Sequence, residues 1–391
     1  MTQTATLIQT REILQHQLQL LWQQPDLASC LPPVMLWGPP GVGKSTVIRE
    51  LCKELQIGFI DVRLAQREPV DLRGLPVPDG DQVRWLLSSE WPRNPNSKGI
   101  ILFDELTAAD RTLQVAAYEF ILDRRLGELY QVPDGWLICA AGNRSEDRAV
   151  AMTFSSALAN RFCHLELAPD LEEWVRWAAS RALDPLVSAF LRFRPQAFFS
   201  MSGNLERGWP SPRSWERVAH LLQHRQQLSW DALALMVHGL VGEGAATEFL
   251  GFARWAEQLP DIPALLRGEL LFEPPGRADQ RFALCAALAY HLWRAKDAAE
   301  QQLFLEHFFR IGLALSSDFA TLAMMDAMEG QDEAEQMQRA EAIFCHPRFE
   351  AWSNLHGQVL ARAQEACFTS STSNLQKGEQ LPQPSESLRH I

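Results

Sequence analysis

Two adjacent carboxylates, Asp104 and Glu105, end an apolar run of sequence, IILFDEL at 100–106. The four apolar residues before them predict a buried strand. A carboxylate that leaves a dry strand costs free energy unless something pairs with it. These two acids therefore require a partner from another part of the chain or from a ligand.

A glycine-rich loop supplies such a partner. The segment GPPGVGKS, Gly38 to Ser45, matches the phosphate-binding pattern GxxxxGK[ST] at every position. An apolar strand pattern, VMLW, precedes it and a helical pattern, TVIRELCKEL, follows it, which is the context that this pattern requires. The alternative, a glycine-rich turn with a chance lysine, is disfavoured by this complete match in the right context.

The loop predicts a cradle for nucleotide phosphates. Glycines let backbone N–H groups turn inward around phosphate oxygens, and the N-terminus of the following helix adds the positive end of its dipole. We expect Lys44, one of only five lysines, to reach the β- and γ-phosphates, and the Ser45 hydroxyl to bind Mg²⁺. The predicted nucleotide-binding residues are Gly38, Pro39, Pro40, Gly41, Val42, Gly43, Lys44, Ser45, Thr46 and Asp104.

A bound Mg²⁺-nucleotide gives each carboxylate a separate role. Asp104 is placed to hold Mg²⁺ together with Ser45, and Glu105 to polarise a water for in-line attack on the γ-phosphate. A kinase or GTPase does not need the second acid, so the pair favours ATP hydrolysis. The alternative, that both acids merely cap the next helix, is weaker because Thr107 or Asp110 serves that purpose better.

Three further residues fit the same chemistry. Asn143 ends the apolar run WLICAAG, where its side chain could orient the attacking water, and Arg161 in ALANRF precedes another strand pattern. An arginine there would project into the nucleotide of a neighbouring subunit. Arg213 falls in the first turn of a helix that Ser211 caps and Pro212 begins. Each residue alone is a weak signal; together, in this order, they support catalytic roles for Glu105, Asn143, Arg161 and Arg213.

Composition bounds the class of protein. A chain of 391 residues, 47% of them hydrophobic, can bury a sizeable core and predicts two or three domains. The net charge of −12 argues against a surface built for non-specific binding of nucleic acid, although a local basic pore stays open. Seven scattered cysteines without a CxxC pair indicate reduced thiols, and no run is long enough to span a membrane. We therefore predict a cytoplasmic protein.

Strand and helix patterns alternate up to about residue 170. Five apolar runs, at 34–37, 57–62, 99–104, 136–142 and 162–167, predict a five-stranded parallel sheet covered on both faces. The later chain is helical. The predicted domains are 1–170 for ATP binding, 171–265 for a helical lid, 266–368 for a helical extension, and 369–391 for a disordered tail.

With these motifs in place, the sequence resembles the AAA+ ATPases, and within them the MoxR-like and dynein-related branch. The resemblance rests on GPPGVGKS, IILFDE, Asn143, ALANRF and SPRS. The segment 68–87 looks like the branch's helix-2 insert with a hairpin that turns at PDG. The segment 124–138 looks like the hairpin before Asn143, again turning at PDG. One departure is AGNR at 141–144, where many relatives have a threonine followed by Asn-Pro.

The resemblance covers about residues 8–265 and has several implications. It implies a P-loop NTPase αβα sandwich followed by a helical lid, and it leaves the all-α C-terminal region unmatched. It implies Mg²⁺ and ATP as cofactors and a homo-oligomeric ring, usually hexameric, with ATP at the subunit interfaces. It also implies a chaperone or remodelling role on a protein partner, often one with a von Willebrand factor A domain. No DxSxS motif is present, so such a domain would belong to a separate chain.

Other readings stay open at this point. One is a nucleic-acid-associated AAA+ ATPase, such as a loader or a defence or transposition regulator, which the acidic charge disfavours. Another is a nucleotide-gated scaffold that hydrolyses slowly. Arg144 or Arg125 could replace Arg161 as the arginine that acts in trans. His220 and His224 lie four apart on a predicted helix, but without a metal-binding motif they are interpreted as ordinary helix residues.

Overall fold

The computed structural model of the chain describes residues 4–144, 147, 159–202, 207–225 and 228–376. These residues form two compact units. The first comprises Met1–Val175 and Pro195–Ala246, and the second comprises Arg176–Arg194 and Thr247–Ile391. The predicted boundaries at 170, 265 and 368 stay predictions.

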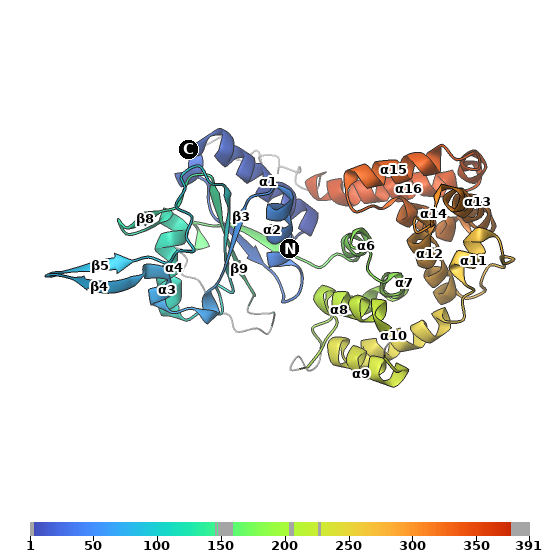
Figure 1. The fold of residues 1–391 in the computed structure, drawn as a ribbon, viewed down its shortest axis with the longest axis horizontal. Helices are drawn as coiled ribbons and strands as arrows, with labels where there is room; N and C mark the ends of the chain where they lie inside the picture. The colour runs from blue at the N-terminus through green and yellow to red at the C-terminus, as the bar shows by residue number, and fades with distance from the viewer. Residues whose placement is uncertain (1–3, 145–146, 148–158, 203–206, 226–227, 377–391) are drawn as a thin grey trace, which may run out of the picture. The chain divides into compact units, whose positions relative to one another are not determined.

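A six-stranded parallel sheet is the centre of the first unit (Figure 1). Its strands are, in spatial order, β1 (Thr4–Ala5), β10 (Cys163–Leu167), β2 (Val34–Trp37), β9 (Trp136–Gly142), β6 (Gly99–Asp104) and β3 (Gly58–Arg63). Five of these match the predicted runs to within one residue. The prediction of five strands is wrong by one, because β1 has only two residues, one of them exposed, and gives no apolar pattern.

The sheet is covered on both faces, as predicted. Successive side chains of a strand point to opposite faces of the sheet and join different hydrophobic clusters. On β6, Ile101 and Phe103 pack with helix α4 (Arg111–Asp123) on one face. Ile100 and Leu102 pack with α1 (Leu7–Gln23) and α2 (Lys44–Glu54) on the other. This explains why the strand sequences are apolar at consecutive positions. The helices of this unit are α1 (Leu7–Gln23), α2 (Lys44–Glu54), α3 (Pro69–Arg73), α4 (Arg111–Asp123), α8 (Pro212–Gln223) and α9 (Trp230–Val241).

Several local predictions are confirmed. Asp110 caps α4 by accepting hydrogen bonds from the N–H groups of Thr112 and Leu113. Ser211 caps α8, and Pro212 is its first residue. Short 3-10 turns lie at Pro25–Ser29, Leu64–Gln66 and Pro195–Ala197.

Two hairpins extend from the sheet unit. β4 (Leu75–Asp79) and β5 (Gln82–Leu86) are antiparallel and turn at Gly80, within the predicted PDG. β7 (Arg125–Leu126) and β8 (Tyr130–Gln131) form the second hairpin. The prediction that this one also turns at PDG is wrong. It turns around Gly127, whose φ is +52°, and the PDG at 133–135 leads into β9 instead.

The second unit is entirely helical among the residues that the structure describes. Its helices are α7 (Pro185–Phe193), α11 (Ile262–Arg267), α12 (Ala278–Leu292), α13 (Ala298–Ala314), α14 (Ser317–Met328), α15 (Glu333–Phe344) and α16 (Phe349–Gln376). Helices α6 (Leu171–Ser180) and α10 (Glu243–Ala256) include the points where the chain passes between the units. The end of the predicted disordered tail, 377–391, lies outside the described residues.

An ion pair connects distant segments of this helical unit. The Arg192 guanidinium at the end of α7 donates to both carboxylate oxygens of Asp326 in α14, at 2.7 and 2.6 Å. The two side chains are 10% and 15% exposed. A charge buried to this degree needs its partner, since the desolvation of either ion is otherwise uncompensated.

Breaking this pair should destabilise the second unit. In Arg192→Ala the Asp326 carboxylate loses its guanidinium partner, and we expect a loss of about 3 kcal/mol. Native-state hydrogen exchange of the α7 and α14 amides measures it. Arg267→Ala is the matched control, because the Arg267–Glu269 pair is more exposed and should contribute much less to stability. Equal losses in the two variants would contradict the prediction.

Candidate functional site

The phosphate loop lies between the end of β2 and the start of α2. Three of its glycines have left-handed backbone, Gly38, Gly41 and Gly43, with φ of +152°, +82° and +103°. At Gly38 a Cβ atom would lie 2.7 Å from the carbonyl oxygen of Leu167. The loop therefore requires glycine here for both conformation and space. Val42 is buried in the core, which anchors the loop to the sheet unit.

Lys44 is the centre of the site. Its Nζ donates hydrogen bonds to the carbonyl oxygens of Gly38 and Pro39, at 2.6 and 3.0 Å, and to Oδ1 of Asn143 at 3.0 Å. Burial lowers the pKa of Lys44 to about 8, although the Asp104 and Asp147 carboxylates act to raise it. An ammonium group in this position is compensated best by an anion such as a phosphate.

The predicted metal ligands are in direct contact. Ser45 Oγ donates to Oδ2 of Asp104 at 2.5 Å, and the backbone N–H of Glu105 donates to Oδ1 of Asp104 at 2.9 Å. A hydroxyl and a carboxylate at the end of one strand form an oxygen donor set of the kind that Mg²⁺ prefers. Glu105 is exposed and has a left-handed backbone, with φ of +57°.

Asn143 is held by a residue that the sequence analysis considered only as a helix cap. The Thr107 hydroxyl accepts from the backbone N–H of Asn143 at 3.1 Å and lies 3.3 Å from its carbonyl oxygen. Thr107 is 1% exposed. The neighbouring Gly142 leaves room for it, since a Cβ there would lie 2.7 Å from Thr107 Cγ2. Only the contact between the segments that follow β6 and β9 reveals this support, so no local sequence signal could have indicated it.

A further carboxylate in the same region was also missed. Burial raises the pKa of Asp61 on β3, and the nearby Asp104 carboxylate raises it further. The guanidinium groups of Arg63 and Arg49 partly offset this rise. Arg49 Nη2 lies 3.3 Å from Oδ2 of Asp61. A polar residue inside the run GFIDVR is the one signal that could have identified it.

The structure places Arg213 close to the loop and Arg161 apart from it. A Cβ at Gly41 would lie 3.4 Å from Cβ of Arg213 and 3.2 Å from Oγ of Ser211, so the start of α8 lies against the loop. Arg213 also acts to lower the pKa of Lys44. Arg161 is exposed in the turn before β10, and among the described residues no hydrogen bond or ion pair links it to Lys44, Ser45 or Asp104.

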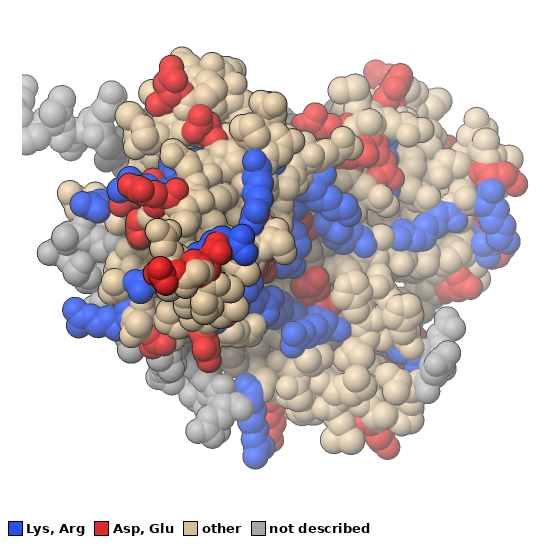
Figure 2. Space-filling view, turned by 60° about the vertical axis from the view of Figure 1, so that its left-hand side comes forward, with Lys and Arg blue, Asp and Glu red and all other residues tan. Residues whose placement is uncertain are grey.

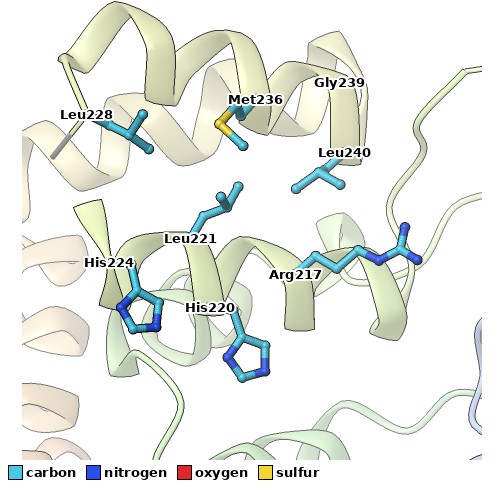
Figure 3. A pocket seen from close by; sticks show the side chains of 8 residues that line it. All are labelled: Arg217, His220, Leu221, His224, Leu228, Met236, Gly239 and Leu240. Atoms are coloured by element: carbon cyan, nitrogen blue, oxygen red, sulfur yellow. The ribbon is translucent and has the colours of Figure 1, made fainter. Parts of the chain in front are cut away.

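His220 and His224 line a groove between α8 and α9 of about 620 Å³ (Figure 3). The rest of its lining is mainly apolar: Leu221, Leu228, Met236, Gly239 and Leu240, with Arg217. Within the described ranges no group of three or more His, Cys, Asp or Glu side chains could hold a metal. The groove shares no lining residue with the phosphate-loop cluster.

Comparison with known families agrees with this geometry. Residues 34–162 match the sequence profile of the AAA family, the ATPase family associated with various cellular activities. Residues 34–162 form an AAA ATPase domain. Members of this family hydrolyse ATP with Mg²⁺, and the loop, the buried ammonium and the Ser45–Asp104 pair fit that cofactor. In the part of the chain that the structure describes, no helix combines the length and the apolar character needed to cross a bilayer.

Solved structures resemble the chain more distantly. A RuvB mutant from Thermotoga maritima is 17% identical, over 79% of this chain and 92% of that one, with a TM-score of 0.37. The RuvB Holliday junction branch migration motor of the same organism is 17% identical, over 72% and 84%, with a TM-score of 0.35. NtrX from Brucella abortus is 15% identical, over 82% and 67%, with a TM-score of 0.33. We infer no function from similarities this low. The search of curated proteins found no match to the chain.

The pKa of Lys44 predicts a proton linkage of nucleotide binding. In the free protein the pKa of about 8 leaves Lys44 mostly neutral at pH 9, whereas a bound triphosphate favours the charged form. Binding at pH 9 should therefore take up close to one proton, and affinity should fall as pH rises above about 8. At pH 7 Lys44 is already charged, and uptake through it should be small.

Calorimetry with Mg²⁺ and a non-hydrolysable ATP analogue, in buffers of different ionisation enthalpy, measures this uptake. Lys53→Met, at an exposed lysine of the same helix, is the control and should retain it. Absence of proton uptake at pH 9 in the wild-type protein would contradict the assignment.

Proposed function

We propose that this ATPase is a MoxR-like remodelling or chaperone enzyme that uses ATP hydrolysis to act on a protein partner. The β4–β5 hairpin carries the proposal. It projects away from the sheet (Figure 1), and its cross-strand pairs are Pro76 with Trp85 and Pro78 with Val83. Because paired residues of an antiparallel ladder share a face, these four side chains form one uncharged face.

This face is suited to contact with protein. Val83 and Trp85 are 59% and 41% exposed, although their side chains are among those most often buried in proteins. The prolines at 76 and 78 lack N–H groups, so β4 offers no backbone donor at these two positions and is a poor edge for pairing with another strand. Binding would therefore use the apolar face. Nucleic acid is bound mainly through basic contacts to phosphate, which this face does not offer.

The distribution of charge favours the same choice. The chain carries a net charge of −12, and on the face drawn in Figure 2 acidic side chains lie among the basic ones. A protein with a von Willebrand factor A domain is the partner class that the MoxR-like branch suggests.

Each site residue has a proposed role. Mg²⁺ supplies charge stabilisation for phosphoryl transfer when bound, and Ser45 and Asp104 would hold it. Lys44 would bind the phosphates, Glu105 would take the proton of the attacking water, and Asn143 would orient that water. Arg213 would reach the nucleotide from α8. The Thr107 hydroxyl fixes Asn143 in place by accepting a hydrogen bond from the backbone N–H of Asn143.

Arg161 is the proposed arginine finger, supplied to the nucleotide of a neighbouring copy in a cytoplasmic hexameric ring. Its exposure leaves it able to reach another subunit. Arg144, the alternative, is bound within its own chain: it donates to both carboxylate oxygens of Asp147, and its Nη1 lies 3.5 Å from Glu166. Arg125, the other alternative, is exposed on the short strand β7.

Glu105→Gln separates binding from hydrolysis. The amide keeps the size of the side chain but cannot accept a proton, so we expect Mg²⁺-ATP to bind normally while turnover falls about a hundredfold or more. Stopped-flow binding and steady-state phosphate release measure the two effects. Turnover at the wild-type rate would show that Glu105 is not the base, and would favour a nucleotide-gated scaffold.

The class of partner is tested through stimulation of turnover. We expect ATPase activity to rise several-fold with an interacting protein and to be unchanged by single-stranded DNA, duplex DNA or RNA at low salt. Trp85→Ser and Val83→Ser should reduce the protein-stimulated increment, because they remove the apolar face. Strong stimulation by nucleic acid, with none by protein, would overturn the proposal in favour of a nucleic-acid-associated motor.

A further inference from the structure

A chain of hydrogen bonds connects the strand before the phosphate loop to the turn that carries Arg161. Trp37, the last residue of β2, donates from Nε1 to Nδ1 of His164 at 2.8 Å. The other ring nitrogen of His164, Nε2, lies 2.7 Å from the carbonyl oxygen of Ala159. The indole and imidazole planes are nearly parallel, 19° apart, and the ring centroids are 5.9 Å apart.

These two bonds fix the tautomer of His164. An indole N–H can only donate, so Nδ1 must be the acceptor and carry no hydrogen. Nε2 must then carry the hydrogen and donate to the Ala159 carbonyl, which can only accept. The ring is thereby held in one orientation from both sides. Removing either partner would release this constraint.

One end of this chain lies at the phosphate loop. Trp37 immediately precedes Gly38, whose carbonyl oxygen accepts a hydrogen bond from Lys44. Gly38 also packs against β10, since a Cβ atom there would lie 2.7 Å from the Leu167 carbonyl oxygen. The β10 strand, Cys163–Leu167, thus contacts the loop at its C-terminal end and carries His164 near its N-terminal end.

The other end is the turn that presents Arg161. The Ala159 carbonyl oxygen accepts from His164 and, at 3.3 Å, from the backbone N–H of Phe162. Phe162 is 7% exposed and packs in the core cluster beneath α4. Arg161 is therefore exposed between two fixed residues. Ala159 is held by the hydrogen bond from His164, and Phe162 is held by its burial in the core.

We propose that His164 is a positioning residue: it holds the Arg161 turn at a fixed place relative to the phosphate loop of its own subunit, so that Arg161 is aimed correctly at the nucleotide of the next. This inference rests on the proposed role of Arg161 as a finger supplied in trans. A finger contributes through exact placement of its charge, and a misplacement of about 1 Å can reduce the rate about a hundredfold.

The first test uses His164→Phe, which keeps an aromatic ring but loses both hydrogen bonds. We expect turnover to fall about tenfold or more while the affinity for Mg²⁺-ATP stays within about twofold of wild type. Trp37→Phe, which releases Nδ1, should act in the same direction. His164→Gln retains one donor and one acceptor and should recover part of the rate. Thermal unfolding of each variant checks that it is folded.

Mixed oligomers distinguish a finger defect from a general loss of structure. Lys44→Ala subunits are expected not to bind ATP but still present an intact Arg161 turn. When they are mixed in excess with His164→Phe subunits, the His164→Phe sites would face wild-type fingers, and turnover per competent site should return towards wild type. Subunits with both Lys44→Ala and Arg161→Ala are the control and should not rescue.

Arg161→Ala mixed in the same way identifies which idea fails. Rescue of both Arg161→Ala and His164→Phe supports the positioning role. Rescue of Arg161→Ala without rescue of His164→Phe overturns that role while leaving the finger intact. No rescue of Arg161→Ala overturns the finger itself, and with it the inference about His164. Wild-type turnover of His164→Phe alone would also overturn the inference.

Discussion

The buried ammonium group of Lys44 is the interaction on which the site depends. A positive charge that is removed from water needs hydrogen-bond acceptors, such as carbonyl oxygens, around it. Here two carbonyls come from the phosphate loop and the third oxygen from Asn143, 99 residues later in the chain. Lys44 therefore binds its own loop to the end of β9. The parallel order of the strands makes this possible, since β2 and β9 are neighbours and end at the same edge.

That edge also explains why separate motifs form one site. β6 lies beside β9, so Asp104 comes within 2.5 Å of Ser45 and Thr107 reaches the backbone of Asn143. In a parallel sheet with helices on both faces, the loops at the C-terminal edge are where polar side chains converge. This convergence is predictable from the sequence because each motif directly follows an apolar run, and the structure confirms the runs at 34–37, 99–104 and 136–142.

Features without a local pattern were harder to predict. β1 is two residues long and is defined by its pairing with β10. The second hairpin turns at Gly127 although PDG, a strong turn signal, lies six residues later. Thr107 and His164 form hydrogen bonds with residues 36 and 127 positions away, and the Arg192–Asp326 pair joins residues separated by 134 positions. Such contacts follow from the fold as a whole, which periodicity and spacing do not specify.

Asp104 and Glu105 are neighbours in sequence but differ in almost every physical respect. Asp104 ends a strand and accepts two hydrogen bonds, so its carboxylate is fixed before any ligand binds. Glu105 adopts left-handed backbone, an unfavourable conformation for a residue with a Cβ atom, and its side chain is exposed. This difference supports the proposed roles of Asp104 in metal binding and Glu105 in proton transfer, because a metal ligand must be placed in advance whereas a base must adjust to the water it activates.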